Sequence, residues 1–333
     1  MTEKKWHYIR SESTDPELNL ALEQYVFDQL DRNSSYMMLW QNANAVIVGK
    51  HQNTIEEINT VFVKEHCIKV VRRLSGGGAV YQDLGNINFT FITDKEGEDF
   101  DFAFFCHPVV EILQSLGADA KTSGRNDMTI KDMKFSGNSQ YMKQGRIMHH
   151  GTLMFDSDLN ALSKALSVSK DKIESKGIKS TRSRVTNIRP HIAQDCSAKE
   201  FMDILELELI KRLKAEIIPF NTVDMKEVER IRHDLYSTWE WNYSSSPAYS
   251  ICKKRRYEGV GEIEIRMEIA DGHIRALVFF GDFFTKKDIK ELIDTLLGVR
   301  ADETSVLEVL KNMRVDEYFR NLQNENLVDL IIH

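Results

Sequence analysis

Proline, glycine, cysteine and long apolar runs are all scarce in this sequence, and each shortage excludes a class of protein. The 333 residues include 5 prolines and 17 glycines, with 42% hydrophobic and 29% charged residues. This composition is typical of a folded globular chain and excludes disordered and collagen-like proteins. No run approaches the roughly 18 consecutive apolar residues of a membrane-spanning helix, and the first residues lack the apolar core of a signal peptide. We therefore expect a cytoplasmic protein that does not act at a membrane.

Closely spaced cysteines and an excess of positive charge are absent as well. Cys67, Cys106, Cys196 and Cys252 form no CxxC pair, which argues against zinc and redox dithiols and favours reduced, mostly buried thiols. The chain has 44 Lys and Arg against 51 Asp and Glu, a formal net charge of −7. Proteins that grip nucleic acid usually present strongly basic surfaces, so we expect no nucleic-acid partner.

Helix and strand signals alternate through the first 240 residues. A capping box, Thr14-x-x-Glu17, and apolar residues on one face predict a helix over residues 14–32. Short, partly β-branched runs predict strands at 36–40, 45–48, 68–71 and 88–92, and helices are expected at 103–117 and 197–215. This mixture predicts an α/β or α+β domain built on one sheet.

A second, smaller domain is expected at the carboxyl end. Polar turn formers at 243–247 mark a boundary that divides the chain into residues 1–246 and 247–333. Residues 262–269 then alternate with period two, Asp271-Gly272 signals a hairpin turn, and 273–280 supply the return strand, with two or three helices after it. The basic cluster at 253–256 is expected to be a solvated linker face rather than a nucleic-acid site.

The stretch from Arg72 to Asn86 is the most informative part of the sequence. It contains Gly76-Gly77-Gly78 directly after an expected strand, and consecutive N–H groups free of side chains can cradle phosphate oxygens. The adjacent guanidinium groups of Arg72 and Arg73 would add fixed positive charge for an anion. A flexible hairpin loop is the alternative. The pattern is neither GxxxxGK[ST] nor GxGxxG, so the nucleoside-triphosphatase and dinucleotide fingerprints do not apply.

A second polar segment brings together Asn126, Asp127 and Lys134. The first two offer donors and acceptors that could read the edge of a base, and Lys134 offers a cation for a phosphate and a carbonyl oxygen. A solvated hairpin is the alternative.

Two further segments carry groups that could bind a ligand. On a strand expected at 149–155, His149 and His150 point to opposite faces, so they are a poor pair of metal ligands and at most one of them faces a ligand. The basic, hydroxyl-rich run 175–187 suits a mobile loop that closes over phosphates, with an exposed linker as the alternative.

Taken in order, these segments resemble lipoate–protein ligases over nearly the whole chain, including the carboxy-terminal domain. The resemblance is carried by Asp15-Pro-x-x-Asn-Leu-Ala-Leu-Glu23, Trp40 with Val46-Ile-Val-Gly-Lys-His-Gln-Asn53, Arg72-Arg-x-Ser-Gly-Gly-Gly-Ala-Val-Tyr81, Gly124-Arg-Asn-Asp127, Lys134-x-Ser-Gly137, His149-His-Gly-Thr152 and Ser180-x-Arg-Ser-Arg-Val-Thr-Asn187. One position departs from the family pattern: Gln82 stands where a histidine often follows the glycine-loop tyrosine. The resemblance implies a catalytic domain of the biotin/lipoate–protein ligase fold on a mixed sheet, followed by a small α+β domain.

The resemblance also implies an activity. Enzymes of this family use ATP and Mg²⁺ to convert lipoate to lipoyl-adenylate, and they transfer the lipoyl group to a lysine of lipoyl domains in 2-oxoacid dehydrogenase E2 subunits or of glycine-cleavage H protein. Lys134 matches the catalytic lysine, and an apolar slot for lipoate is expected near Val46, Val71 and Val80. The residues implied to bind ATP or lipoyl-adenylate are Arg73, Ser75, Gly76, Gly77, Gly78, Ala79, Val80, Tyr81, Asn126, Asp127, Lys134, His150 and Arg184. No protein ligand to the metal is expected, because Mg²⁺ would be held through the phosphates.

Three other functions are weighed against this one. The nearest is a lipoyl or octanoyl transferase of the same fold that takes its acyl group from a carrier protein without adenylation. Those that form a thioester need a reactive cysteine, and none of the four lies inside the segments that carry the resemblance. A biotin ligase is disfavoured by the lipoate type of the glycine-rich segment, and a non-catalytic binding protein by the presence of Lys134.

Overall fold

An eight-stranded sheet forms the centre of the larger part of the protein. The computed structural model describes residues 4–94, 102–123, 126–166, 185–219, 223–243, 251–270 and 272–332. The strand order is β11-β1-β2-β6-β10-β9-β8-β7. The strands are β1 (Lys5–Arg10), β2 (Ser34–Trp40), β6 (Asn86–Asp94), β7 (Ala120–Ser123), β8 (Asp127–Ile130), β9 (Met133–Lys143), β10 (Arg146–Met154) and β11 (Glu216–Ile217). β1 runs parallel to β2 and β11 and the other neighbours are antiparallel, so the sheet is mixed.

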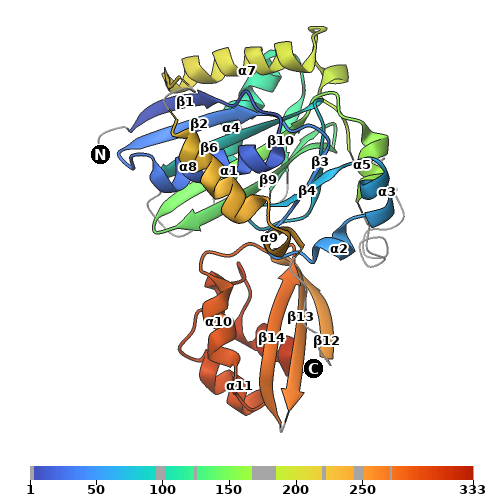
Figure 1. The fold of residues 1–333 in the computed structure, drawn as a ribbon, viewed down its shortest axis with the longest axis vertical. Coiled ribbons are helices and arrows are strands. Elements are labelled where there is room, and N and C mark those ends of the chain that lie inside the picture. Colours follow the sequence, from blue (N-terminus) through green and yellow to red (C-terminus); the bar gives the residue numbers. More distant parts are fainter. Residues whose placement is uncertain are drawn as a thin grey trace.

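Helices cover both faces of this sheet (Figure 1). On one face α4 (Phe102–Ser115) and α7 (Ala198–Leu213) enclose a core that contains Phe89 and Phe91. On the other face lie α1 (Pro16–Gln29), α8 (Met225–Ile231) and the π-helical turn η4 (Arg232–Tyr236). A capping box of Ser197 and Glu200 begins α7, at the start of the helix predicted over 197–215. At α1 the side chain of Asp15, rather than Thr14, caps the first turn.

A separate three-stranded sheet packs beside the first. It has the order β4-β3-β5, with β3 (Ala45–Val48), β4 (Lys69–Arg72) and β5 (Val80–Gln82). Around it lie α2 (Thr54–Glu57), α3 (Thr60–Glu65), α5 (Leu159–Ala165) and α9 (Trp239–Tyr243). The turn η2 (Arg189–His191) lies beyond the end of β10, where the N–H of Arg189 donates to the carbonyl oxygen of Phe155 (3.0 Å). All four residues of β3 are buried, because this sheet has apolar layers on both faces. The predicted fold class is confirmed. The expectation of one sheet is wrong, because the strands predicted at 45–48 and 68–71 form this second sheet and do not join the large one.

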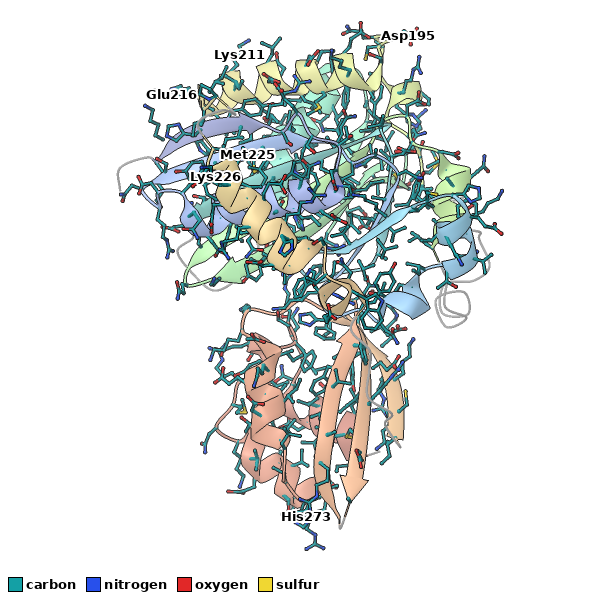
Figure 2. The ribbon with its side chains drawn as sticks, in the orientation of Figure 1. Asp195, Lys211, Glu216, Met225, Lys226 and His273 are labelled. Atoms are coloured by element: carbon teal, nitrogen blue, oxygen red, sulfur yellow. The ribbon has the colours of Figure 1, made fainter. Side chains whose placement is uncertain are left out.

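The carboxy-terminal part has a sheet and a core of its own. An antiparallel sheet of β12 (Ile251–Tyr257), β13 (Gly261–Ala270) and β14 (His273–Gly281) is covered by α10 (Ile289–Leu296), α11 (Glu303–Leu310), η5 (Val315–Glu317) and α12 (Asn324–Ile332). His273 lies at the end of this sheet that points away from the rest of the protein (Figure 2). The predicted hairpin is confirmed. The basic cluster at 253–256, expected as a linker, instead lies on strand β12, where its side chains pair with carboxylates such as Asp329. The boundary at residue 246 stays a prediction, because 244–250 lie outside the described residues.

The segment after β14 contacts the first part of the protein. The N–H of Gly281 donates to the carbonyl oxygen of His51 (2.8 Å), and the ring of His51 stacks on that of Phe283, with centroids 4.7 Å apart. Phe284 packs against Phe102, with ring centroids 5.5 Å apart. Within the described ranges, no helix has the length and hydropathy needed to cross a membrane.

Candidate active site

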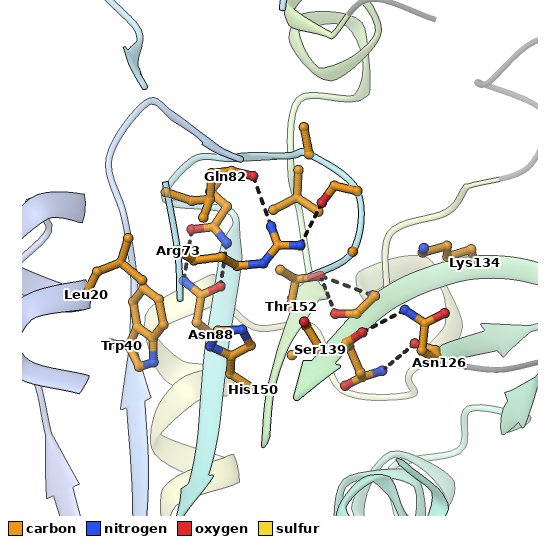
Figure 3. Close-up of a pocket in the computed structure, with 18 residues that line it drawn as sticks. Leu20, Trp40, Arg73, Gln82, Asn88, Asn126, Lys134, Ser139, His150 and Thr152 are labelled. Carbon is orange, nitrogen blue, oxygen red and sulfur yellow. Dashed lines mark hydrogen bonds between the residues drawn. The ribbon is translucent and has the colours of Figure 1, made fainter. Parts of the chain in front are cut away.

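A cavity of about 110 Å³ opens where the two sheets of the first part meet (Figure 3). Its lining comes from α1, from β3 and β5 of the small sheet with the loop between β4 and β5, and from β2, β6, β9 and β10 of the large sheet. The lining residues are Leu20, Trp40, Ile47, Arg73, Gly77, Gly78, Ala79, Val80, Gln82, Asn88, Asn126, Lys134, Gly137, Asn138, Ser139, His150, Gly151 and Thr152. The cavity therefore depends on the second sheet, which supplies the wall that carries the glycine loop.

Arg73 holds the glycine loop in shape. Its guanidinium donates to the carbonyl oxygens of Ile47 (3.2 Å), Gly76 (2.6 Å) and Gly78 (2.9 Å), and its Nε donates to Oγ of Ser75 (3.1 Å). Burial lowers the pKa of Arg73 to about 10. All four acceptors are neutral, so its positive charge lies beside the cavity without a carboxylate in hydrogen-bond contact, and it favours a bound anion.

Arg72 faces away from the cavity. Its guanidinium donates to the carbonyl oxygens of Gly49, Lys50 and Gln52 and to the hydroxyl of Thr54. Arg72 therefore stabilises the turn after β3 and does not present its charge to a ligand, unlike the pair of guanidinium groups expected from the sequence.

A buried chain of hydrogen bonds connects α1 to the glycine loop. Nδ1 of His150 lies 2.9 Å from Oε1 of Glu23, and its Nε2 lies 2.6 Å from Oγ of Ser75. Glu23 also accepts from the hydroxyl of Thr90 (2.6 Å). A carboxylate at Nδ1 favours the tautomer with its proton there, so that Nε2 accepts from Ser75.

The neighbouring histidine points to the other face of the sheet, as expected. Nδ1 of His149 accepts from Gln140 (2.9 Å), and its ring stacks on that of Phe105. Burial holds the pKa of His149 well below its usual range. Only His150 of the pair lines the cavity.

Lys134 reaches the cavity because of a β-bulge. β8 and β9 pair Met128 with Ser136 and then Thr129 with Lys134, so Phe135 has no partner across the ladder. One extra residue shifts the alternation of side chains by one position, which places Phe135 in the core and turns Lys134 toward the cavity.

Asp127 and the end of the basic run lie next to Lys134. Nζ of Lys134 is 2.7 Å from Oδ1 of Asp127, and each of these side chains is 38% exposed. The carbonyl oxygen of Lys134 accepts from the N–H of Thr186 (2.9 Å), which ties residues 185–187 to the cavity. The side-chain amide of Asn126 donates to the backbone of Asn138 (2.7 Å).

The structure brings most of the predicted site residues together. Those that line the cavity are Arg73, Gly77, Gly78, Ala79, Val80, Asn126, Lys134 and His150. Ser75 and Asp127 contact lining residues, and Gly76 lies against the carbonyl of Phe283. Tyr81 points away, because Val80 and Gln82 on either side of it face the cavity. Arg184 lies outside the described residues.

Several lining residues could not be assigned from the sequence. The apolar wall uses Leu20, Trp40 and Ile47 together with Val80, whereas Val46 and Val71 are buried in the core on either side of the small sheet. All three lie within or beside segments that carry the resemblance, but from the sequence Leu20 and Ile47 look like ordinary core residues.

Gln82 belongs to a network of buried amides beside the apolar wall. Its side chain accepts from Asn42 (2.7 Å) and donates to Asn88 (2.8 Å). The amide of Gln82 thus provides hydrogen-bond partners for the side chains of Asn42 and Asn88, and it has no group that titrates. Among the described residues, no three or more His, Cys, Asp or Glu side chains are grouped as a metal site.

Two family models match the chain. The model of the lipoyl protein ligase A/B catalytic domain matches residues 15–210, and that of the bacterial lipoate protein ligase C-terminus matches residues 246–331. Lipoate-protein ligase LplJ of Bacillus subtilis is 43% identical over 321 residues, which cover 95% of this chain and 97% of that protein.

Solved structures similar to this chain include lipoate protein ligases as well. The structure of P. falciparum LipL1 in complex with lipoate superposes with a TM-score of 0.80 at 25% identity, covering 98% of each chain. A bi-partite lipoate protein ligase from Thermoplasma acidophilum, studied with its E2 lipoyl domain, gives a TM-score of 0.62 at 26% identity, covering 75% of this chain and all of that one.

Proposed function

The chain belongs to the lipoate–protein ligase family of enzymes, and we propose that it activates lipoate with ATP and transfers the lipoyl group to a lysine of lipoyl domains. The observation that carries this proposal is the polarity of the cavity. Leu20 and Trp40 lie on one side and Lys134 and Asn126 on the other, with the glycine loop over them (Figure 3). The aliphatic chain and dithiolane of lipoate fit the apolar side, which directs the carboxylate toward Lys134.

In the first half-reaction, a carboxylate oxygen of lipoate attacks the α-phosphorus of ATP and pyrophosphate leaves. The N–H groups of residues 76–78 are suited to hold phosphate oxygens, and the charges of Arg73 and Lys134 stabilise the negative charge that develops. Mg²⁺ bound through the phosphates would neutralise further charge, as proposed from the sequence.

In the second half-reaction, the neutral amine of the acceptor lysine attacks the acyl carbonyl and AMP leaves. The ammonium of Lys134 stabilises the oxyanion, so Lys134 acts through its positive charge and is not a nucleophile. Ser75 accepts a hydrogen bond from Arg73 and contacts His150, so these two residues keep Arg73 in position at the cavity wall. Asp127 orients Lys134 through their ion pair.

The proposed acceptors are lipoyl domains of 2-oxoacid dehydrogenase complexes and glycine-cleavage H protein. The Thermoplasma acidophilum relative, studied with its E2 lipoyl domain, supports the first of these. We also propose the division into residues 1–246 and 247–333 and a location in the cytoplasm.

The alternative, acyl transfer from a carrier protein without adenylation, has less support. A thioester route needs an accessible cysteine at the site. Cys106 and Cys196 are buried, whereas Cys67 and Cys252 are exposed, so the expectation of mostly buried thiols is wrong for half of them; none of the four cysteines lines the cavity.

The test is intact mass spectrometry of an apo lipoyl domain mixed with enzyme, lipoate and Mg²⁺, with and without ATP. We expect the mass of a lipoyl group to be added only with ATP. The Lys134→Ala enzyme should be inactive, and Lys131→Ala, an exposed lysine of the same hairpin, is the matched control. Addition without ATP from an acylated carrier protein would support the transferase instead.

A further inference from the structure

Glu23 is a buried carboxylate that reaches the proposed active site only through other side chains. It lies on α1, is 2% exposed and does not line the cavity. A first branch of hydrogen bonds comes to it from the apolar wall. Nε1 of Trp40 donates to Oγ1 of Thr90 (3.0 Å), and the hydroxyl of Thr90 donates to Oε1 of Glu23 (2.6 Å). Because an indole N–H can only donate, this branch has one direction, from Trp40 to the carboxylate.

A second branch comes to Glu23 from the glycine loop. Nε of Arg73 donates to Oγ of Ser75 (3.1 Å), and this hydroxyl lies 2.6 Å from Nε2 of His150. Nδ1 of His150 in turn lies 2.9 Å from Oε1 of Glu23. A guanidinium also only donates, so Ser75 accepts from Arg73 and donates to His150, whose proton on Nδ1 goes to Glu23. Both branches therefore end on the same carboxylate, although they start on different sides of the cavity.

The charges at the two ends of the second branch support this arrangement. A buried carboxylate is costly unless hydrogen-bond donors and an opposite charge compensate it. The direct donors to Glu23 are a hydroxyl and an imidazole, and the cation at the end of the branch is Arg73. Burial lowers the pKa of Arg73, and attraction from Glu23 opposes that shift. Ionised groups strengthen the neutral hydrogen bonds that connect them, so a neutral group in place of the carboxylate should loosen both branches.

We propose that Glu23 is a positioning residue of the ligase reaction, which holds Trp40 and Arg73 in a fixed arrangement through these two branches. This inference rests on the proposed function, in which lipoate packs against Trp40 and the phosphates of ATP lie beside Arg73. Glu23 contacts neither substrate, but it fixes the two sides of the cavity that align the reacting carboxylate with the α-phosphorus. Thr90 and Ser75 each serve one of these sides only.

The first experiment measures the binding of lipoate and, separately, of an ATP analogue with a methylene bridge between the α- and β-phosphates. Calorimetry gives the two dissociation constants. Thr90→Val keeps the shape of the side chain but removes the hydroxyl, so it should raise the constant for lipoate about tenfold and that for the analogue less than about twofold. Ser75→Ala should do the reverse. Glu23→Gln should raise both constants about tenfold, because it weakens both branches.

Thr93→Val is the matched control for these variants. Oγ1 of Thr93 lies 2.7 Å from Oγ of Ser35, so this variant also loses a hydroxyl contact on β6, but away from the cavity, and both constants should stay unchanged. A general loss of stability would raise both constants together. Equal effects of Thr90→Val on the two ligands, or unchanged constants in Glu23→Gln, would therefore overturn the proposal. If Glu23→Gln folds poorly, the opposite preferences of Thr90→Val and Ser75→Ala decide.

The indole resonance of Trp40 tests the first branch in the enzyme without ligands. In ¹H–¹⁵N spectra its Nε1–H signal should move most in Thr90→Val, less in Glu23→Gln and not at all in Ser75→Ala. An unmoved signal in Glu23→Gln would overturn the proposal whether or not the enzyme binds its substrates. Shifted signals in an enzyme that binds neither lipoate nor the analogue would overturn the proposed function, and the role of Glu23 in it, while the hydrogen bonds themselves would stand.

Discussion

The two walls of the proposed active site are held in different ways. The glycine-loop wall, residues 73–82, is fixed by Arg73, which is 6% exposed and donates to four acceptors of the protein. The lysine wall, the β8–β9 hairpin, holds Lys134 by one ion pair in which both side chains are 38% exposed. The first wall is thus formed before a ligand binds, whereas Lys134 can exchange Asp127 for a substrate anion.

The sharpest test of this difference is Lys134→Ala. We expect the rate of adenylate formation to fall about 10³-fold, because the variant lacks the positive charge that is proposed to stabilise the reacting atoms. The melting temperature should hardly change, because the side chain is half-exposed. Single-turnover kinetics and thermal unfolding measure the two effects, with Lys131→Ala as the control. A large loss of stability would show that the lysine wall is as structurally important as the glycine-loop wall.

Arg73→Met should show the opposite pattern, with stability lost as well as activity. The carbonyl oxygens of Ile47, Gly76 and Gly78 would lose their donor, at a cost of about 3 kcal/mol in the free energy of unfolding. Urea unfolding gives this value. Arg230→Met, at an exposed helix position, is the control and should unfold like the unmodified protein. Normal stability in Arg73→Met would contradict a loop held by this side chain.

Alanine substitutions distinguish two neighbouring glycines of the loop. A Cβ at Gly76 would lie 2.2 Å from the carbonyl oxygen of Phe283, whereas a Cβ at Gly78 would meet nothing within 4 Å. Gly76→Ala should therefore cost about 2 kcal/mol of unfolding free energy and displace the segment after β14, and Gly78→Ala should cost less than about 0.5 kcal/mol. Urea unfolding and limited proteolysis of the two variants, compared side by side, check this, and equal behaviour would contradict it.

Acid should destabilise the folded protein through His51, which lies in the turn after β3. Burial, with repulsion from Lys50 and Arg72, holds the pKa of His51 well below its usual range in the folded protein. Below about pH 6.5 the unfolded chain then binds a proton that the folded one does not, so the free energy of unfolding falls as the pH falls, by about 1.4 kcal/mol per pH unit for each such histidine. His51→Phe, which keeps a ring against Phe283, should reduce the loss of unfolding free energy between pH 6.5 and 5.5 by about 1 kcal/mol, because an unfolded histidine is only half protonated at pH 6.5. An unchanged slope would mean that His51 is protonated when folded.

Asp127→Asn should have the smallest effect. A half-exposed ion pair contributes about 0.5 kcal/mol, so the melting temperature should stay nearly constant and kcat/KM should change about threefold or less. Steady-state kinetics at saturating ATP measure the change. A loss as large as that of Lys134→Ala would show that Lys134 cannot act without this partner.

The elements with a clear period were predicted well from the sequence. The helices near 14–32, 103–117 and 197–215 and the hairpin after residue 261 are present, because their apolar spacing is a local property of the chain. The division of the strands between two sheets was not predicted. Residues 45–48 and 36–40 are both short apolar runs, and only contacts with distant strands decide which sheet each of them joins.

The site was predicted through the resemblance, and its geometry required the structure. Lys134 was identified by its motif, but the bulge at Phe135 that turns it into the cavity leaves no mark in the alternation of residue types. Tyr81 belongs to the same motif as Val80, but its side chain points away from the cavity that Val80 lines. The roles of Arg72 and Arg73 differ although the two residues are adjacent and chemically identical, because each faces a different set of carbonyl groups.

The contact of Gly76 with the carbonyl of Phe283 has a consequence for reading alignments of this family. It joins a backbone atom of the glycine loop to a backbone atom after β14, and neither partner uses a side chain that could change in step with the other. Pairwise covariation should therefore be silent at this point, and position 76 should simply stay glycine. Covariation across the junction should come instead from the ring pairs that meet there, His51 with Phe283 and Phe102 with Phe284.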